Sequence, residues 1–136
     1  MEEKSKIFLS YLNAISHRNI DDLKVIIDAQ AKFEYPYALP ATSSIIHGVE
    51  GICTHLLKPH FSSTYLEKKL TEIPHSDLLI AELASTEFYP KTSKSYHQNI
   101  ISLVTIRDHK IHHYKEFFNP VTRLEGLLGL ETEGLD

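Results

Sequence analysis

Glu116 stands in an alternating segment whose neighbours on the same side, Tyr114 and Phe118, are aromatic. A carboxylate directed into an aromatic pocket loses its hydration, which is costly for the charged form. Desolvation raises the pKa of such a group, and a carboxyl group with a raised pKa can act as a general acid near neutral pH. Glu116 is therefore the first candidate catalytic residue. The structural alternative is a Glu bonded to a backbone amide or to a cation such as Arg123.

His55 is the expected catalytic partner of Glu116. It follows Ile52 and Val49 at helical spacing, on the inner edge of an apolar stripe. A histidine that faces the interior can shuttle a proton or hold an anionic group of a substrate. The alternative is a core histidine whose ring nitrogens are satisfied by structural hydrogen bonds.

Other polar and aromatic side chains could complete a pocket around this pair. Asn99 is expected one register step from Glu116 on the same face, where it could orient the carboxyl group. For each of these residues the alternative is a structural role in a wall or a strand. The expected substrate-binding residues are Tyr35, Tyr37, His97, Asn99, Tyr114 and Phe118.

The nine histidines are scattered along the chain and form no metal-binding motif. HExxH is absent, and no Cys/His pairs have zinc-finger spacing. The adjacent His112 and His113 would point to opposite faces of a strand, so they cannot chelate one ion together. We expect neither a metal ion nor an organic cofactor.

The composition narrows the class of protein. With 136 residues the chain can bury one core, and we expect a single domain over 1–136 with its core at about 4–129. The net charge is −4 and no basic stripe occurs, which argues against nucleic-acid binding. The single Cys53, the acidic start and the absence of a long apolar run predict a cytoplasmic protein without membrane contact.

The hydrophobic periodicity predicts an α+β fold. Phe8, Tyr11, Leu12 and Ile15 form one helical stripe, and a second helix begins after an N-cap at Asn19. Further helices are expected at 48–58 and 120–128, a loop at 39–44, and strands at 31–37, 65–73, 78–89, 96–107 and 110–119. Pro36 indicates an edge position for the first strand. The order predicts a bent antiparallel sheet with about three main helices on one side and a pocket between them.

The last two strands are expected to form a hairpin with a tight turn at Asp108-His109. If Arg107 and Lys110 flank this turn and the pairing continues evenly, Ile101 lies opposite Glu116. The pocket face would then carry His97, Asn99, Ile101, Leu103, Tyr114, Glu116 and Phe118. The other face is also largely apolar, which predicts a homodimer through Ile100, Ser102, Val104, Ile111, His113 and Phe117.

Three segments carry a resemblance to a known family: Phe33-Glu34-Tyr35-Pro36-Tyr37, the run from Ile46 to Ile52, and Lys115-Glu116-Phe117-Phe118-Asn119-Pro120. With these motifs in this order, the chain resembles SnoaL-like proteins of the superfamily named for nuclear transport factor two. Within that family it looks most like the phenazine-biosynthesis A/B proteins. The resemblance implies a cone-shaped fold, a strongly bent sheet around a pocket, and a homodimer formed through the sheet.

The resemblance also implies an acid/base role for Glu116 and an active-site position for His55. Pro59 departs from the family, which has Ser at that place, so part of the substrate-binding set is missing. The first hypothesis is an isomerase, cyclase or condensing enzyme that acts on a small cyclic or carbonyl compound. The alternatives are a non-catalytic module that binds a hydrophobic small molecule and a structural homodimer with a vestigial pocket. Ketosteroid-isomerase chemistry is disfavoured, because a Tyr and two acids cannot be placed around the pocket.

Overall fold

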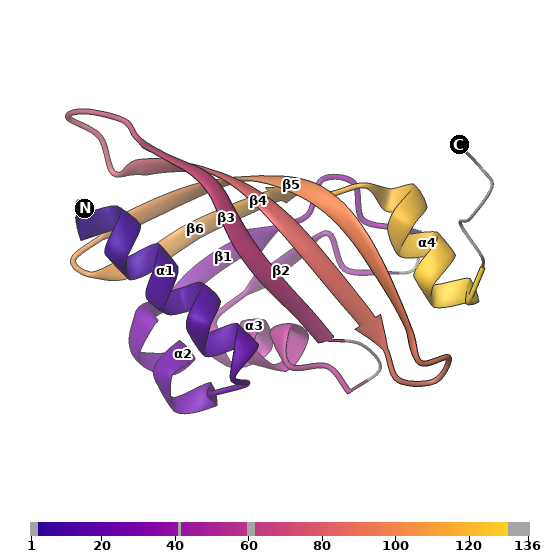
Figure 1. Ribbon diagram of the computed structural model, residues 1–136. Helices are drawn as coiled ribbons and strands as arrows, with labels where there is room; N and C mark the ends of the chain where they lie inside the picture. The colour runs from indigo at the N-terminus through magenta and orange to yellow at the C-terminus, as the bar shows by residue number, and fades with distance from the viewer. Residues whose placement is uncertain (1–2, 41, 60–61, 131–136) are drawn as a thin grey trace.

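The computed structural model describes residues 3–40, 42–59 and 62–130. Its helices and strands follow the predicted order, with one additional short strand (Figure 1). The elements are α1 (Glu3–Ser16), α2 (Ile20–Ile26), β1 (Ile27–Glu34), β2 (Ile45–His47), α3 (Val49–Leu56), β3 (Ser62–Glu72), β4 (Leu78–Tyr89), β5 (Lys94–Arg107), β6 (Lys110–Phe117) and α4 (Pro120–Leu128). The predicted α+β class is confirmed.

The described strands form one sheet in the order β2-β1-β6-β5-β4-β3. All neighbours pair antiparallel except β1 and β6, which run parallel, so the expectation of a purely antiparallel sheet is wrong at this one pair. β1 is an inner strand, and the edge position inferred from Pro36 is also wrong. The strand ends at Glu34, two residues before the proline, and no ladder hydrogen bond is lost.

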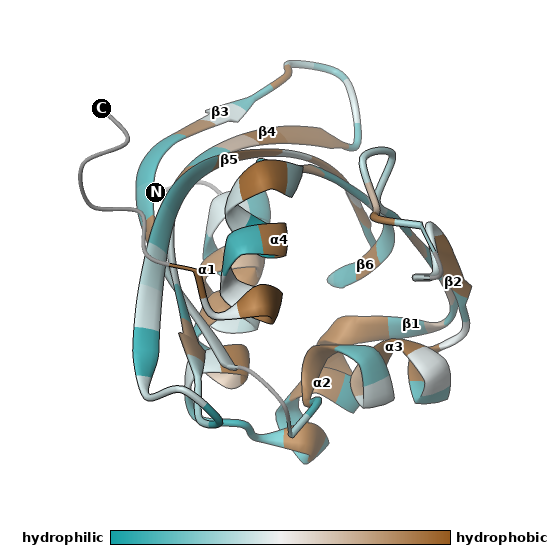
Figure 2. Ribbon diagram, turned by 90° about the vertical axis from the view of Figure 1, so that its right-hand side faces the viewer, coloured by the Kyte–Doolittle hydropathy of each residue, from teal (hydrophilic) through white to brown (hydrophobic). Residues whose placement is uncertain are grey.

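The sheet curls strongly, and the helices close it (Figure 2). α1 buries the predicted stripe, with Phe8, Tyr11, Leu12 and Ile15 all in the core. Asn19 caps α2 by accepting a hydrogen bond from the backbone N–H of Asp22 at 3.1 Å, as predicted. Within the described residues, no helix has both the length and the apolar character needed to cross a bilayer.

The hairpin of β5 and β6 has the predicted turn but not the predicted register. Asp108 and His109 both have positive φ, as a tight two-residue hairpin turn requires, and Arg107 pairs with Lys110. A β-bulge then follows: Ile106 pairs with Ile111, but Thr105 pairs with His113. β6 therefore has one extra residue at this point, and its pairing beyond the bulge moves by one.

The bulge corrects which side chains of β5 face inward. Ser102, not Ile101, lies opposite Glu116. His97, Asn99 and Ile101 are exposed on the outer face, although they were expected in the pocket. A shift of one residue exchanges the two faces of a strand, which is why all of these assignments fail together. The residues of β5 that are buried instead are Tyr96, Gln98, Ile100, Ser102, Val104 and Ile106.

The same correction applies to the expected homodimer surface. Ile100, Ser102 and Val104 were expected there but are buried, and so is Ile111. His113 and Phe117 are half-buried in β6, and the exposed Ile101 of β5 pairs with Phe117. The outer face thus differs from the prediction mainly in its β5 residues.

α4 lies across the open end of the curled sheet (Figure 2). Asn119 caps it by accepting from the N–H of Val121, and Gly129 ends it in the left-handed conformation. Gly126 lies against the ring of Tyr89 so closely that a Cβ would overlap the ring. Only glycine at this position allows the helix to approach the sheet as it does.

Candidate functional site

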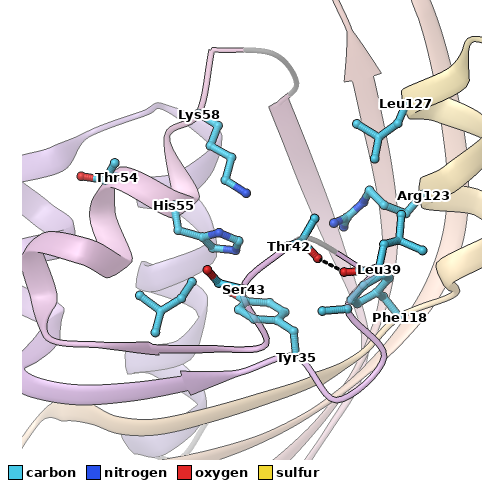
Figure 3. Close-up of a pocket in the computed structure, with 12 residues that line it drawn as sticks. Tyr35, Leu39, Thr42, Ser43, Thr54, His55, Lys58, Phe118, Arg123 and Leu127 are labelled. Carbon is cyan, nitrogen blue, oxygen red and sulfur yellow. Dashed lines mark hydrogen bonds between the residues drawn. The ribbon is translucent and has the colours of Figure 1, made fainter.

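A pocket of about 440 Å³ opens between α4 and the α3 side of the fold (Figure 3). This volume is within the range usual for sites that bind small molecules. The walls are mostly apolar, with polar groups from α3, from the segment after β1 and from α4. The lining residues are Tyr35, Ala38, Leu39, Thr42, Ser43, Ile46, Thr54, His55, Lys58, Phe118, Arg123 and Leu127.

Basic side chains lie on opposite walls of this pocket. Lys58 and His55 point inward from one side, and Arg123 points toward them from the other (Figure 3). Burial lowers the pKa of Lys58, and the positive charge of Arg123 lowers it further. The influence of Arg123 on the pKa of Lys58 fits basic groups that face each other across the pocket.

A small recess of about 30 Å³ adjoins the pocket and contains Glu116. Three of its lining residues, Tyr35, His55 and Arg123, also line the main pocket. The recess with the buried carboxyl group therefore lies next to the ligand-sized cavity. Its other lining residues are Ile15, Leu56, Ser63 and Tyr65.

Glu116 is buried, with 3 % of its surface exposed, and its Oε1 accepts a hydrogen bond of 2.6 Å from the Tyr114 hydroxyl. Burial raises the pKa of Glu116. The Tyr114 bond and the charge of Arg123 oppose this rise, and the charge of Glu87 adds to it. The net direction is upward, so the neutral acid is favoured more than in an exposed glutamate.

Glu87 and Arg123 form a buried ion pair that the sequence analysis did not identify. Arg123 donates from Nε to Oε1 of Glu87 at 3.0 Å and from Nη2 to Oε2 at 2.8 Å. The Tyr89 hydroxyl and the Gln98 amide also donate to this carboxylate. Burial alone would lower the pKa of Arg123. The hydrogen bonds to Glu87 and its negative charge outweigh this effect, so the pKa of Arg123 is raised. Arg123 is thus held in a fixed position at the border of pocket and recess.

One signal in the sequence could have revealed Glu87. Leu79, Ala81 and Leu83 alternate as the apolar side of β4, and continuing this alternation by two steps of two residues reaches Glu87. An acid on an apolar face requires a buried partner. No comparable pattern leads to Arg123, because its placement depends on how α4 lies on the sheet.

The structure places the predicted site residues unevenly. Tyr35 lines both cavities, and its ring centroid is 4.8 Å from that of His55. Phe118 forms a wall, with the Arg123 guanidinium 4.5 Å from the centre of its ring. Tyr114 lines neither cavity and lies behind Glu116. Of the residues predicted for the site, Glu116 and His55 line the recess together, and Tyr35 and Phe118 line the pocket.

Three predicted substrate-binding residues lie elsewhere. Tyr37 is 55 % exposed and packs its ring against Phe117, because the chain turns after β1 and the alternation does not continue. His97 is on the outer face, where its Nδ1 is 3.0 Å from the hydroxyl of Thr86. Asn99 is exposed on the same face. The last two errors follow from the bulge. Among the described residues, no group of three metal-binding side chains comes together.

Solved structures similar to this chain share one fold. A candidate isomerase from Bacillus subtilis has a TM-score of 0.85 at 21% identity, covering 95% of this chain and 97% of that one. IdmH of Streptomyces antibioticus, a candidate polyketide cyclase, has a TM-score of 0.73 at 15% identity, covering 93% and 99%. An NTF2-like protein from Burkholderia xenovorans has a TM-score of 0.73 at 13% identity, covering 91% and 95%. The chain has the NTF2-like fold, as the resemblance to SnoaL-like proteins implied.

A curated relative defines the family more closely. An uncharacterized PhzA/B-like protein of Pseudomonas aeruginosa is 31% identical over 100 residues, which cover 72% of this chain and 71% of the relative. No protein-family profile matches the chain. The chain belongs to the PhzA/B-like family.

Proposed function

We propose that the protein is an acid/base enzyme that needs no cofactor and acts on a small cyclic or carbonyl compound. The observation that carries this proposal is that Glu116 and His55 line one recess beside a ligand-sized pocket. A carboxyl group with a raised pKa can donate a proton near neutral pH, and a nearby histidine can take part in the transfer. Isomerisation, cyclisation and imine-forming condensation all need groups that transfer protons in this way.

The walls of the pocket suggest the character of the substrate. Phe118, Tyr35 and Leu39 offer flat or apolar contacts for a ring. An anionic substituent on that ring would stabilise the charged form of Lys58, which burial and Arg123 disfavour. The similar solved structures include a candidate isomerase and a candidate polyketide cyclase, which fits acid/base chemistry on ring compounds.

The proposal is tested by replacing the proton donor without changing its shape. A thermal-shift screen of small aromatic acids and cyclic ketones would first identify a ligand and a turnover assay. Glu116→Gln should then lower turnover by a factor of about 10² or more, because the side chain no longer carries a transferable proton. The Kd of the ligand should change far less. Unchanged turnover in Glu116→Gln would refute the enzyme hypothesis.

A non-catalytic binding module is the second candidate, and the size of the recess favours it. About 30 Å³ is room for roughly one water molecule, so a ligand in the main pocket reaches Glu116 only through a narrow contact. Under this hypothesis a ligand binds in the 440 Å³ pocket, and Glu116→Gln leaves its binding and the protein's biological role intact.

We also propose that the protein forms a homodimer through the outer face of the sheet. Ile101 is 48 % exposed there. Phe117 pairs with it on β6, Leu103 lies two residues further along β5, and both are half-buried. Such a group of apolar side chains on a sheet face is typical of a subunit contact.

A further inference from the structure

Ser102, Tyr114 and Glu116 form a buried chain of hydrogen bonds behind the recess. Ser102 Oγ donates to the Tyr114 hydroxyl at 2.9 Å, and that hydroxyl donates to Glu116 Oε1 at 2.6 Å. All three side chains are buried. Ser102 and Tyr114 line neither the pocket nor the recess, so neither of them meets a ligand there directly.

The direction of the chain fixes the role of each oxygen atom. A phenol has a single proton, and the Tyr114 oxygen already accepts from Ser102, so its own proton goes to Glu116. Oε1 of Glu116 is thereby occupied as an acceptor. By elimination, the other oxygen, Oε2, is the atom left to carry the exchangeable proton.

The packing of Tyr114 holds this geometry in place. Its ring stacks on Phe33 with 4.7 Å between centroids and a 27° interplanar angle. The ring centroids of Tyr11 and Tyr35 lie 5.7 Å and 6.4 Å from that of Tyr114. A ring enclosed in this way cannot swing its hydroxyl away from Glu116 without disturbing the core.

We propose that Tyr114 is a positioning residue for Glu116 and that Ser102 sets the direction of its hydrogen bond. This inference rests on the proposed function, in which Glu116 gives a proton to the ligand. In that step the O–H bond at Oε2 breaks, its electron pair stays on the carboxylate, and the proton moves to the ligand. The Tyr114 bond becomes charge-assisted and stronger at that moment, so the chain favours donation over retention of the proton. Taking a proton back from the product restores the acid.

Other groups also act on the Glu116 carboxyl group, and a test must separate them from Tyr114. Those that line the recess beside Glu116 or influence it electrostatically are Arg123 on α4, Glu87 on β4, His55 on α3, Tyr65 on β3, Tyr35 after β1 and Tyr11 on α1. Tyr11 is the matched control, because it belongs to the same cluster of rings but makes no hydrogen bond to Glu116 among the described contacts.

The experiment follows the protonation of Glu116 in the protein without ligand. Infrared difference spectra across a pH series report the carboxyl C=O stretch, and the Glu116→Gln variant identifies the band. Tyr114→Phe should raise the pH midpoint of Glu116 ionisation by about one to two pH units, because the carboxylate loses the hydrogen bond that stabilises it. Ser102→Ala should raise it by less, and Tyr11→Phe should leave it unchanged.

Each outcome bears on the inference. A midpoint in Tyr114→Phe that moves no further than in Tyr11→Phe, or moves down, would overturn it. If Tyr114→Phe does not fold, the milder Ser102→Ala decides: an upward shift supports the chain, and no shift refutes it. The readout needs no turnover. If the midpoint shifts in Tyr114→Phe but Glu116→Gln keeps full turnover, the positioning role stands and the proposed function is rejected. If the midpoint does not shift but Glu116→Gln loses turnover, only the positioning role is rejected.

Discussion

Ser102 lies directly opposite Glu116 on the inner face of the sheet, and this pairing exists only because β6 bulges near His112. Without the bulge, the even register would place Ile101 opposite the carboxyl group and turn Ser102 outward. The hydroxyl that supports Tyr114 would then be absent from the interior. A single inserted residue thus determines the polar surroundings of the candidate acid.

Because Glu116 is buried, its ionisation should lower the stability of the folded state as the pH rises. Its pKa is raised above the ordinary value of 4.5, so the folded state holds the proton more tightly than the unfolded state. The contribution of Glu116 to folding is therefore fully present below the unfolded value and is lost as pH rises through the folded value. Urea unfolding should show Glu116→Gln gaining stability relative to the wild type as the pH rises above the ordinary glutamate value. Replacing the exposed Glu82 by Gln should show no such trend.

The ion pair of Glu87 and Arg123 predicts strong coupling between two substitutions. Arg123→Met leaves a carboxylate that is 1 % exposed without its cation, which should cost about 3–5 kcal/mol in the free energy of unfolding. The double variant with Glu87→Gln should lose much less than the sum of the single changes, because it contains no buried unpaired charge. A double-mutant cycle in urea measures this coupling. Simple additivity would show that the pair does not hold α4 in place.

The contact of Gly126 with Tyr89 predicts that even a methyl group is not tolerated there. Gly126→Ala should lower stability by about 1–3 kcal/mol, because its Cβ overlaps the ring and the helix must move. Gly51 in α3 is the matched control. A Cβ at Gly51 would meet only Ile46 at 3.4 Å, so Gly51→Ala should be neutral or stabilising by about 0.5–1 kcal/mol. Thermal unfolding of both variants checks the contrast, and equal effects would contradict the close contact.

The outer face of the sheet predicts a dimer that one charge can disrupt. Ile101→Glu should yield a folded monomer, because the side chain is exposed in the single chain and would be buried between two copies. Sedimentation at tens of micromolar, roughly where interfaces of standard size persist, gives the mass. Val121→Glu, at an exposed position of α4, should leave the dimer unchanged. A wild-type protein that sediments as a monomer would reject the proposed assembly.

Much of the fold could be predicted from local patterns in the sequence. The stripe of α1, the cap at Asn19 and the turn at Asp108-His109 depend on residues close together in the chain, and all three are confirmed. The bulge could not be predicted in this way. Nothing in the sequence from Lys110 to Phe117 indicates an extra residue. The bulge depends on how β6 packs against its neighbouring strands, which the local sequence does not reveal.

The same distinction between local sequence patterns and contacts between distant segments applies to the candidate site. The helical period of α3 placed His55 inside, and the alternation of β6 beyond the bulge placed Glu116 inside. His97 and Asn99 failed because their facing depended on register between strands. Arg123 could not be placed, since its position follows from the docking of α4, a contact between distant parts of the chain.

The parallel pairing of β1 with β6 has a consequence for how the molecule is made. Lys32 pairs with His113, so an N-terminal strand must wait for one of the last strands to emerge from the ribosome. Until then, β1 has only the short β2 beside it, and Phe33 lacks its neighbour Tyr114 on the other side. Contacts between such distant segments slow folding and leave an apolar strand edge exposed to other chains. Expression at lower temperature or with a chaperone should therefore improve the yield of native protein more than changes to the surface would.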